Sequence, residues 1–94
     1  LPTPLALSAP APNPAPGAVT LRLSLPRGAH VRAYVLDAQG RVVRELSHGG
    51  FSAGVHALAW DGRNADGQPA PAGIFFVCVD AGDRTLVRRL ARVR

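Results

Sequence analysis

The 94-residue sequence predicts an all-β domain, either a sandwich or a barrel. Short stretches in which apolar and polar residues alternate recur along the chain, and turn-forming sequences separate them at intervals of about eight to twelve residues. No stretch before position 84 has the spacing of an amphipathic helix. The length allows one small domain with a modest core.

The first sixteen residues are predicted to form a Pro-rich extended arm or linker. Six of the nine prolines fall there. Each proline fixes φ and lacks a backbone donor, so this segment cannot be a helix or a central strand. A polyproline-like conformation is the first expectation, although residues 5–7 could lie along a sheet edge. The sequence therefore divides into an arm, residues 1–16, and a β-domain, residues 17–94. Because the chain opens like a linker, we expect it to be a piece of a longer product.

After residue 17 the pattern is that of strands joined by turns. Residues 19–25, 30–36, 41–46 and 55–60 are predicted strands, and 74–79 is apolar on both faces, as in a central strand. The turn at 37–40 begins with Asp37, which can bond the backbone ahead of it, and ends with Gly40, which accepts a positive φ. Residues 61–73 form a polar turn region, and 80–83 form another hairpin turn.

Five apolar residues are predicted to form the structural core. Trp60 is the only tryptophan, and burial of about 150–250 Å² at about 25 cal/mol per Å² contributes about 4–6 kcal/mol. An exposed, partner-binding Trp is the alternative. The full predicted set is Trp60, Leu23, Val35, Leu58 and Phe76.

The segment 84–94 supports two conflicting structures. Leu86, Val87, Leu90 and Val93 recur at the spacing of an amphipathic helix. A hairpin turn comes immediately before the segment, and so short a helix is marginal without docking. The residues alone leave strand and helix equally open.

The net charge of +5 comes from the C-terminal segment. The chain has 11 arginines, no lysine and six acidic residues, and residues 1–83 sum to zero. The five C-terminal arginines are the candidate partner-binding site, and an acidic protein surface or export machinery suits their guanidinium groups. A solvated strand face is the alternative without a partner. Nucleic acid is disfavoured because stacking aromatics are missing, and a membrane-surface helix is a further alternative. The cluster comprises Arg84, Arg88, Arg89, Arg92 and Arg94.

No motif predicts catalysis, a cofactor or a metal site. The chain lacks a nucleophile elbow and a phosphate-binding glycine loop, so we expect no enzyme activity. Asp61, Asn64 and Asp66 are spaced unlike a calcium loop, so turn capping is expected, with a weak calcium site as the alternative. The single cysteine, Cys78, excludes an intramolecular disulfide, and we expect it to be a buried apolar residue. The sequence contains no run of 18 apolar residues, so no transmembrane helix is predicted.

Four stretches resemble one known family. They are residues 35–46 (VLDAQGRVVREL), 53–67 (AGVHALAWDGRNADG), 71–76 (PAGIFF), and the Asn-Pro at 13–14 with 23–26 (LSLP). Together they are similar to the C-terminal immunoglobulin-like modules of secreted bacterial proteins, which include type IX secretion sorting domains and the immunoglobulin-like domain of the flagellar hook-capping protein. The resemblance covers about residues 10–94. It implies an immunoglobulin-like antiparallel β-sandwich of about seven strands, in which the last segment is an edge or closing strand.

The resemblance also implies a function. We expect a non-catalytic, secreted or cell-surface module that serves sorting, anchoring or protein–protein assembly, with the parent chain, secretion machinery or complex subunits as partners. The basic end departs from the more apolar tail of the family and weakens the case for sorting. One alternative is a structural subunit that self-associates through its N-terminal arm; another is a basic segment that binds an anionic surface.

Overall fold

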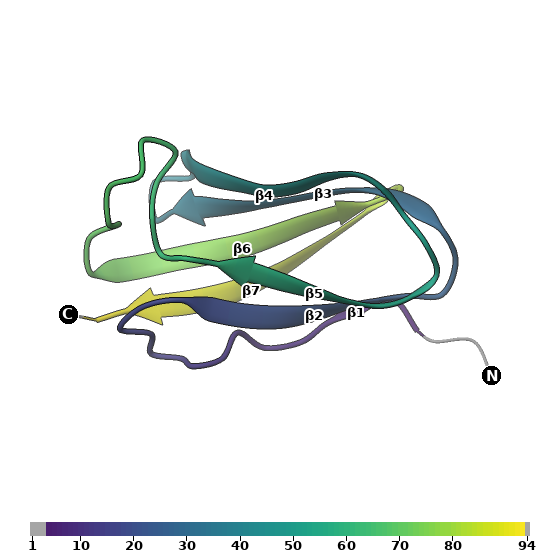
Figure 1. Cartoon of the computed structure of the whole chain (residues 1–94), viewed down its shortest axis with the longest axis horizontal. Helices are drawn as coiled ribbons and strands as arrows, with labels where there is room; N and C mark the ends of the chain where they lie inside the picture. The colour runs from purple at the N-terminus through teal and green to yellow at the C-terminus, as the bar shows by residue number, and fades with distance from the viewer. Residues whose placement is uncertain (1–3, 94) are drawn as a thin grey trace.

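Two antiparallel sheets pack face to face in the computed structural model, which describes residues 4–93 (Figure 1). One sheet has the strand order β1-β2-β5 and the other β4-β3-β6-β7. The predicted immunoglobulin-like sandwich of about seven strands is therefore confirmed. No helix that could cross a membrane occurs among residues 4–93. The strands are β1 (Ala6–Leu7), β2 (Val19–Leu25), β3 (Ala29–Asp37), β4 (Val42–Phe51), β5 (Gly54–Trp60), β6 (Gly73–Ala81) and β7 (Arg84–Arg92).

The core lies between the two sheets and follows the alternation of the sequence. Trp60, Leu23, Val35 and Leu58 are all buried. Phe76 differs from the expectation, because it is half-buried on the outer face of β6, and Phe75 takes the buried position instead. The reason is that β6 is apolar on both faces, so its sequence does not show which residues point inward.

The last segment is a strand rather than a helix. β7 pairs with β6 over nine consecutive positions, from Gly73↔Arg92 to Ala81↔Arg84. This hairpin gives the backbone of β6 its second partner, because β3 pairs on the other side. The resulting ladder outweighs the helical spacing of the side chains, since helix formation in so short a segment is weak.

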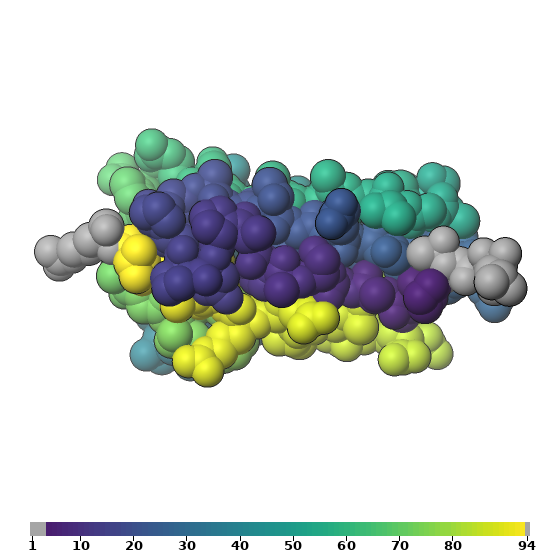
Figure 2. All heavy atoms as spheres, turned by 90° about the horizontal axis from the view of Figure 1, so that it is seen from below, coloured from purple at the N-terminus to yellow at the C-terminus, as the bar shows by residue number. Residues whose placement is uncertain are grey.

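The N-terminal segment crosses from one sheet to the other. Leu7 pairs with Leu23 of β2, while Ala15 bonds the end of β7, where its N–H donates to the Ala91 oxygen (2.8 Å) and its oxygen accepts from Val93 N–H (3.0 Å). Figure 2 shows this segment in purple beside the yellow β7. Leu7 and Ala15 are buried, so residues 4–16 lie against both sheets, and a boundary at residue 16 stays a prediction.

Candidate functional site

Turns at one end of the sandwich bring together the motifs quoted above. The β3–β4 turn begins with Asp37, whose carboxylate accepts the N–H groups of Gln39 and Arg41, each at 2.9 Å. It also pairs with the Arg41 side chain at 2.9 Å. These donors, the Arg41 N–H first, lower the pKa of Asp37. The carboxylate therefore stabilises the turn.

The loop after β5 uses its polar side chains in the same way. Asp61 accepts the N–H of Arg63 (2.9 Å) and pairs with Arg44 (3.2 Å). Asn64 Oδ1 accepts two N–H groups further along the loop, those of Asp66 and Gln68, at 3.0 Å each. These contacts are the turn capping expected from the sequence. Among residues 4–93, no group of three or more His, Cys, Asp or Glu side chains is placed to hold a metal ion.

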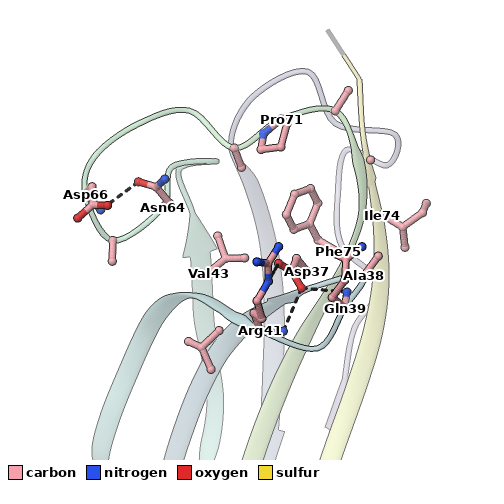
Figure 3. Close-up of a pocket in the computed structure, with 15 residues that line it drawn as sticks. Asp37, Ala38, Gln39, Arg41, Val43, Asn64, Asp66, Pro71, Ile74 and Phe75 are labelled. Carbon is pink, nitrogen blue, oxygen red and sulfur yellow. Dashed lines mark hydrogen bonds and ion pairs between the residues drawn. The ribbon is translucent and has the colours of Figure 1, made fainter.

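A groove of about 590 Å³ lies between these two turns and the start of β6. Figure 3 shows Phe75 and Pro71 facing Val43 across the groove. Asp37 and Asn64 are among the polar side chains around these three residues. An apolar floor inside a polar rim has the composition of a protein–protein contact. Sequence reasoning missed this groove, because its walls come from segments whose convergence only the sheet topology fixes.

The predicted arginine cluster is divided by the fold. Arg84 and Arg89 are exposed. Arg88 is also exposed, but its Nε donates to the Leu7 oxygen at 2.8 Å and so holds the N-terminal segment. Arg92 is buried, and Arg94 lies outside the described residues. The five arginines therefore do not form one exposed surface.

Arg92 contacts the core instead of solvent. Its side chain is only 8% exposed, its guanidinium carbon lies 5.2 Å from the centre of the Trp60 ring, and its Nη1 donates to the Gly17 oxygen at 3.0 Å. Gly62 has a φ of 81°, and a Cβ at that position would overlap the Arg92 guanidinium. The sequence held one signal for this burial. Residues two apart in a strand lie on the same face, so Arg92 shares its face of β7 with the apolar Leu86 and Leu90.

The histidines and the cysteine form no reactive centre in the described part of the chain. The rings of His30 and His48 meet edge-on at 4.9 Å, and His56 Nε2 lies 2.7 Å from the Ser52 oxygen. Cys78 is buried between neighbouring strands, and this burial raises the pKa of its thiol. A thiol of this kind is a weak nucleophile near neutral pH.

A comparison with known families identifies the module. The model of the FlgD Ig-like domain matches residues 13–84. The chain belongs to the FlgD Ig-like domain family. All the motif stretches from 35 to 76 lie inside the match, whereas four of the five C-terminal arginines lie beyond it.

Curated relatives of this FlgD Ig-like domain carry the name basal-body rod modification protein FlgD. Those of Salmonella typhimurium and Escherichia coli are each 42% identical over 53 residues, which is 56% of this chain and 23% of theirs. The chain thus spans about a quarter of the length of the curated relatives that it matches.

Two solved structures from Porphyromonas gingivalis share the fold. Dimeric latent PorU superimposes with a TM-score of 0.69 at 17% identity, over 96% of this chain and 9% of that one. PorZ, described as a surface component of the type IX secretion system, gives a TM-score of 0.62 at 22% identity, over 96% and 11%. Together with the family match, they confirm the resemblance to the immunoglobulin-like modules of secreted bacterial proteins.

Proposed function

We propose that this FlgD Ig-like domain is a non-catalytic module for protein–protein assembly in an exported bacterial protein. The family match over residues 13–84 carries the proposal. The curated relatives are named for the basal-body rod, and we extend a role in building such an assembly to this chain. A secreted or cell-surface location is part of the same proposal.

The geometry of the motif-bearing end supports this function. Its most distinctive polar side chains, Asp37 and Asn64, accept backbone N–H groups within their own turns. They therefore fix the shape of the loops rather than contact a reacting molecule. What this end offers to the outside is the groove, whose apolar floor a partner side chain can cover.

Photo-crosslinking in cells tests the assembly role. A benzoylphenylalanine residue is placed in the full-length parent at Ala65 beside the groove, at Val87 on the outer face of β7, or at Ala59 on β5, and the cells are irradiated. All three side chains are exposed. Assembly predicts an adduct with another exported protein from at least one position. Adducts from none of the three would contradict it.

Sorting or anchoring is a second candidate. The basic end departs from the apolar tail of the family, but the exposed guanidinium groups of Arg84 and Arg89 can bind carboxylates of the export machinery. Changing Arg84 and Arg89 to Gln keeps Arg88 on the Leu7 oxygen and the buried Leu90 and Arg92 in place. Deleting the strand would remove Leu90 and Arg92 from the core. Sorting predicts that the full-length Gln variant stays in the periplasm. Normal export of that variant rejects sorting and leaves assembly standing.

Self-association through the N-terminal arm is a further proposal. Residues 6–15 bond β2 and β7 of their own chain, so an exchanged arm would have to leave these sites first. Light scattering measures the outcome directly. A monomer at every concentration up to the millimolar range would exclude it.

A further inference from the structure

The two sheets have four edge strands, and three of them carry features that block pairing with a further strand. At β7, Ala15 makes backbone hydrogen bonds to Ala91 and Val93. The Asn13 side chain accepts the Ala91 N–H at 3.0 Å. At β1, the Leu7 oxygen accepts from Arg88. β4 has two register shifts against β3, and its Val43 oxygen accepts the N–H of Ala65 at 3.1 Å. Bulges and covering segments of this kind block the addition of a further strand.

The fourth edge, β5, carries none of these features. Gly54–Trp60 contains no charged residue and no proline, and it pairs with β2 in seven consecutive positions without a register shift. Natural proteins usually interrupt such an edge, because its free N–H and C=O groups accept another strand. β5 is therefore the edge that is open to a partner among the described strands.

The backbone groups that β5 leaves free can be named. In β2, Thr20 and Arg22 direct their backbone groups toward the N-terminal segment. Thr20 N–H donates to the Ala11 oxygen, and the Arg22 oxygen accepts from Ser8 N–H, each at 2.9 Å. The intervening β2 residues therefore face β5, and they pair with alternate β5 residues such as Leu58. The remaining β5 residues, Val55, Ala57 and Ala59, direct their N–H and C=O groups away from the sheet.

The charge beside this edge indicates the chemistry of the partner. Arg22 is the one charged residue on the outer face of β1-β2-β5 within the described strands, and its exposed guanidinium has no hydrogen bond or ion pair within residues 4–93. It lies opposite Ala57, whose methyl group does not block the way to the edge. A residue on an added strand opposite Ala57 would be two strand spacings from Arg22, about 9–10 Å between backbones. An Arg and a Glu side chain bridge that gap together.

A hollow beside the edge offers room for the partner's other face. About 260 Å³ of space separates Ala59 and Trp60 of β5 from Leu46 of β4. Side chains of an added strand alternate between the two faces, so those opposite to the acidic residue would point into this hollow. Arg44, Glu45 and Asp61 also line this hollow, but each is paired within the chain, Arg44 with Asp61 and Glu45 with Arg32. An apolar side chain of the partner can pack against Leu46, which lies against the core.

We propose that the free edge of β5 binds an extended acidic segment of a partner protein by strand addition, with Arg22 pairing to an acidic side chain opposite Ala57. The proposal rests on the assembly function and names the surface and the partner's chemistry. A second copy of this chain fits poorly, because β5 supplies no acidic residue and each chain carries a net charge of +5.

A peptide titration followed by NMR of the ¹⁵N-labelled chain tests the proposal. The probe is Val-Thr-Val-Glu-Val-Thr-Val with a Gly-Ser tail, and its counterpart has Lys in place of Glu. The Glu peptide should shift the amide signals of Val55, Ala57 and Ala59 and slow their hydrogen exchange. It should bind about two- to five-fold more tightly than the Lys peptide, as expected for one exposed ion pair.

Three variants make the result specific. Arg22→Glu should reverse the preference between the two peptides, while Arg27→Glu, the same charge change outside β5 and β2, should leave it unchanged. Ala57→Pro should weaken both peptides at least ten-fold, because the ring removes an edge donor that β2 does not use. The Arg22→Glu test stands even where the proline variant fails to fold.

Three results would overturn the proposal. Shifts confined to the groove or to β7 would place the peptide elsewhere, and equal affinity for the Glu and Lys peptides would reject the acidic partner. Concentration-dependent protection of Ala57 without peptide would identify a second copy as the occupant. The crosslinking positions separate the two levels of inference, since adducts from Ala65 or Val87 without one from Ala59 keep the assembly function and reject the β5 edge.

Discussion

Replacing Gly62 by Ala should destabilise the domain more than a Gly-to-Ala change in a loop usually does, because Gly62 is buried against Arg92. The glycine has a φ of 81°, and an L-residue in this region costs about 1–2 kcal/mol. Its new methyl group would also overlap the guanidinium of Arg92, which would have to move. Arg92 would then lose its bond to the Gly17 oxygen and its place over Trp60.

The magnitude follows from these contacts. A hydrogen bond from a charged donor contributes about 1.5–3 kcal/mol, and a cation–π contact about 0.5–2 kcal/mol. Partial loss of both, added to the backbone strain, gives a loss of about 3–4 kcal/mol in the free energy of unfolding. For a domain of this size that lowers Tm by roughly 15–25 °C, which a thermal or urea unfolding curve measures easily.

Gly67 provides the matched control. It has nearly the same φ, 83°, but a Cβ there would meet nothing within 4 Å. Gly67→Ala should therefore cost only the strain, about 1–2 kcal/mol. In an Arg92→Ala background, Gly62→Ala should cost no more than this, so the double-mutant cycle should show a coupling of about 2 kcal/mol. Equal losses for Gly62→Ala and Gly67→Ala in the natural background would refute the reasoning.

Three further results are expected. Trp60→Ala should lower the free energy of unfolding by about 3–5 kcal/mol in urea, because it leaves a cavity in the core; an unchanged Tm would contradict its burial. The pKa of Asp37 is lowered in the folded chain, so its stabilising contribution is complete above its unfolded pKa, about 3.9, and is lost as the pH falls through the folded pKa. Asp37→Asn should therefore reduce the loss of stability on the acid side of a stability–pH profile. An unchanged profile would contradict this. Cys78, buried and with a raised pKa, should react with a thiol reagent at pH 8 only at the rate of unfolding, and rapid labelling of the native chain would show that it is accessible.

The strands and their order of appearance could be predicted because local patterns specify them. Alternation in β2 placed Leu23 correctly, and the turn chemistry of Asp37 and Gly40 is local to four residues. β6 offered no such alternation, so Phe76 was expected inside where Phe75 is found. For β7, helical spacing and a preceding hairpin turn conflicted, and only pairing with β6 decides between them.

The candidate site was less predictable, because it depends on contacts between distant segments. Arg92 and Arg88 lie on the same face of β7, yet Arg92 is buried against Trp60 and Arg88 is exposed. The groove requires the turn at Asp37 to meet a loop more than twenty residues later. The open edge of β5 follows from the strand order β1-β2-β5, in which β5 pairs with β2 alone. Composition carries no information on strand order.

The crossing N-terminal segment also determines how the domain responds to force. β7 and the N-terminal segment run in the same direction, since the bridge between Ala15 and Arg92 is parallel. β1 and the C-terminal end of β7 lie toward opposite ends of the sandwich (Figure 1). A pull on both ends therefore slides the two segments past each other. The bonds of Leu7 and Ala15 would be loaded together in shear instead of opening one at a time. A module built in this way transmits tension along a longer chain while its sheets stay closed.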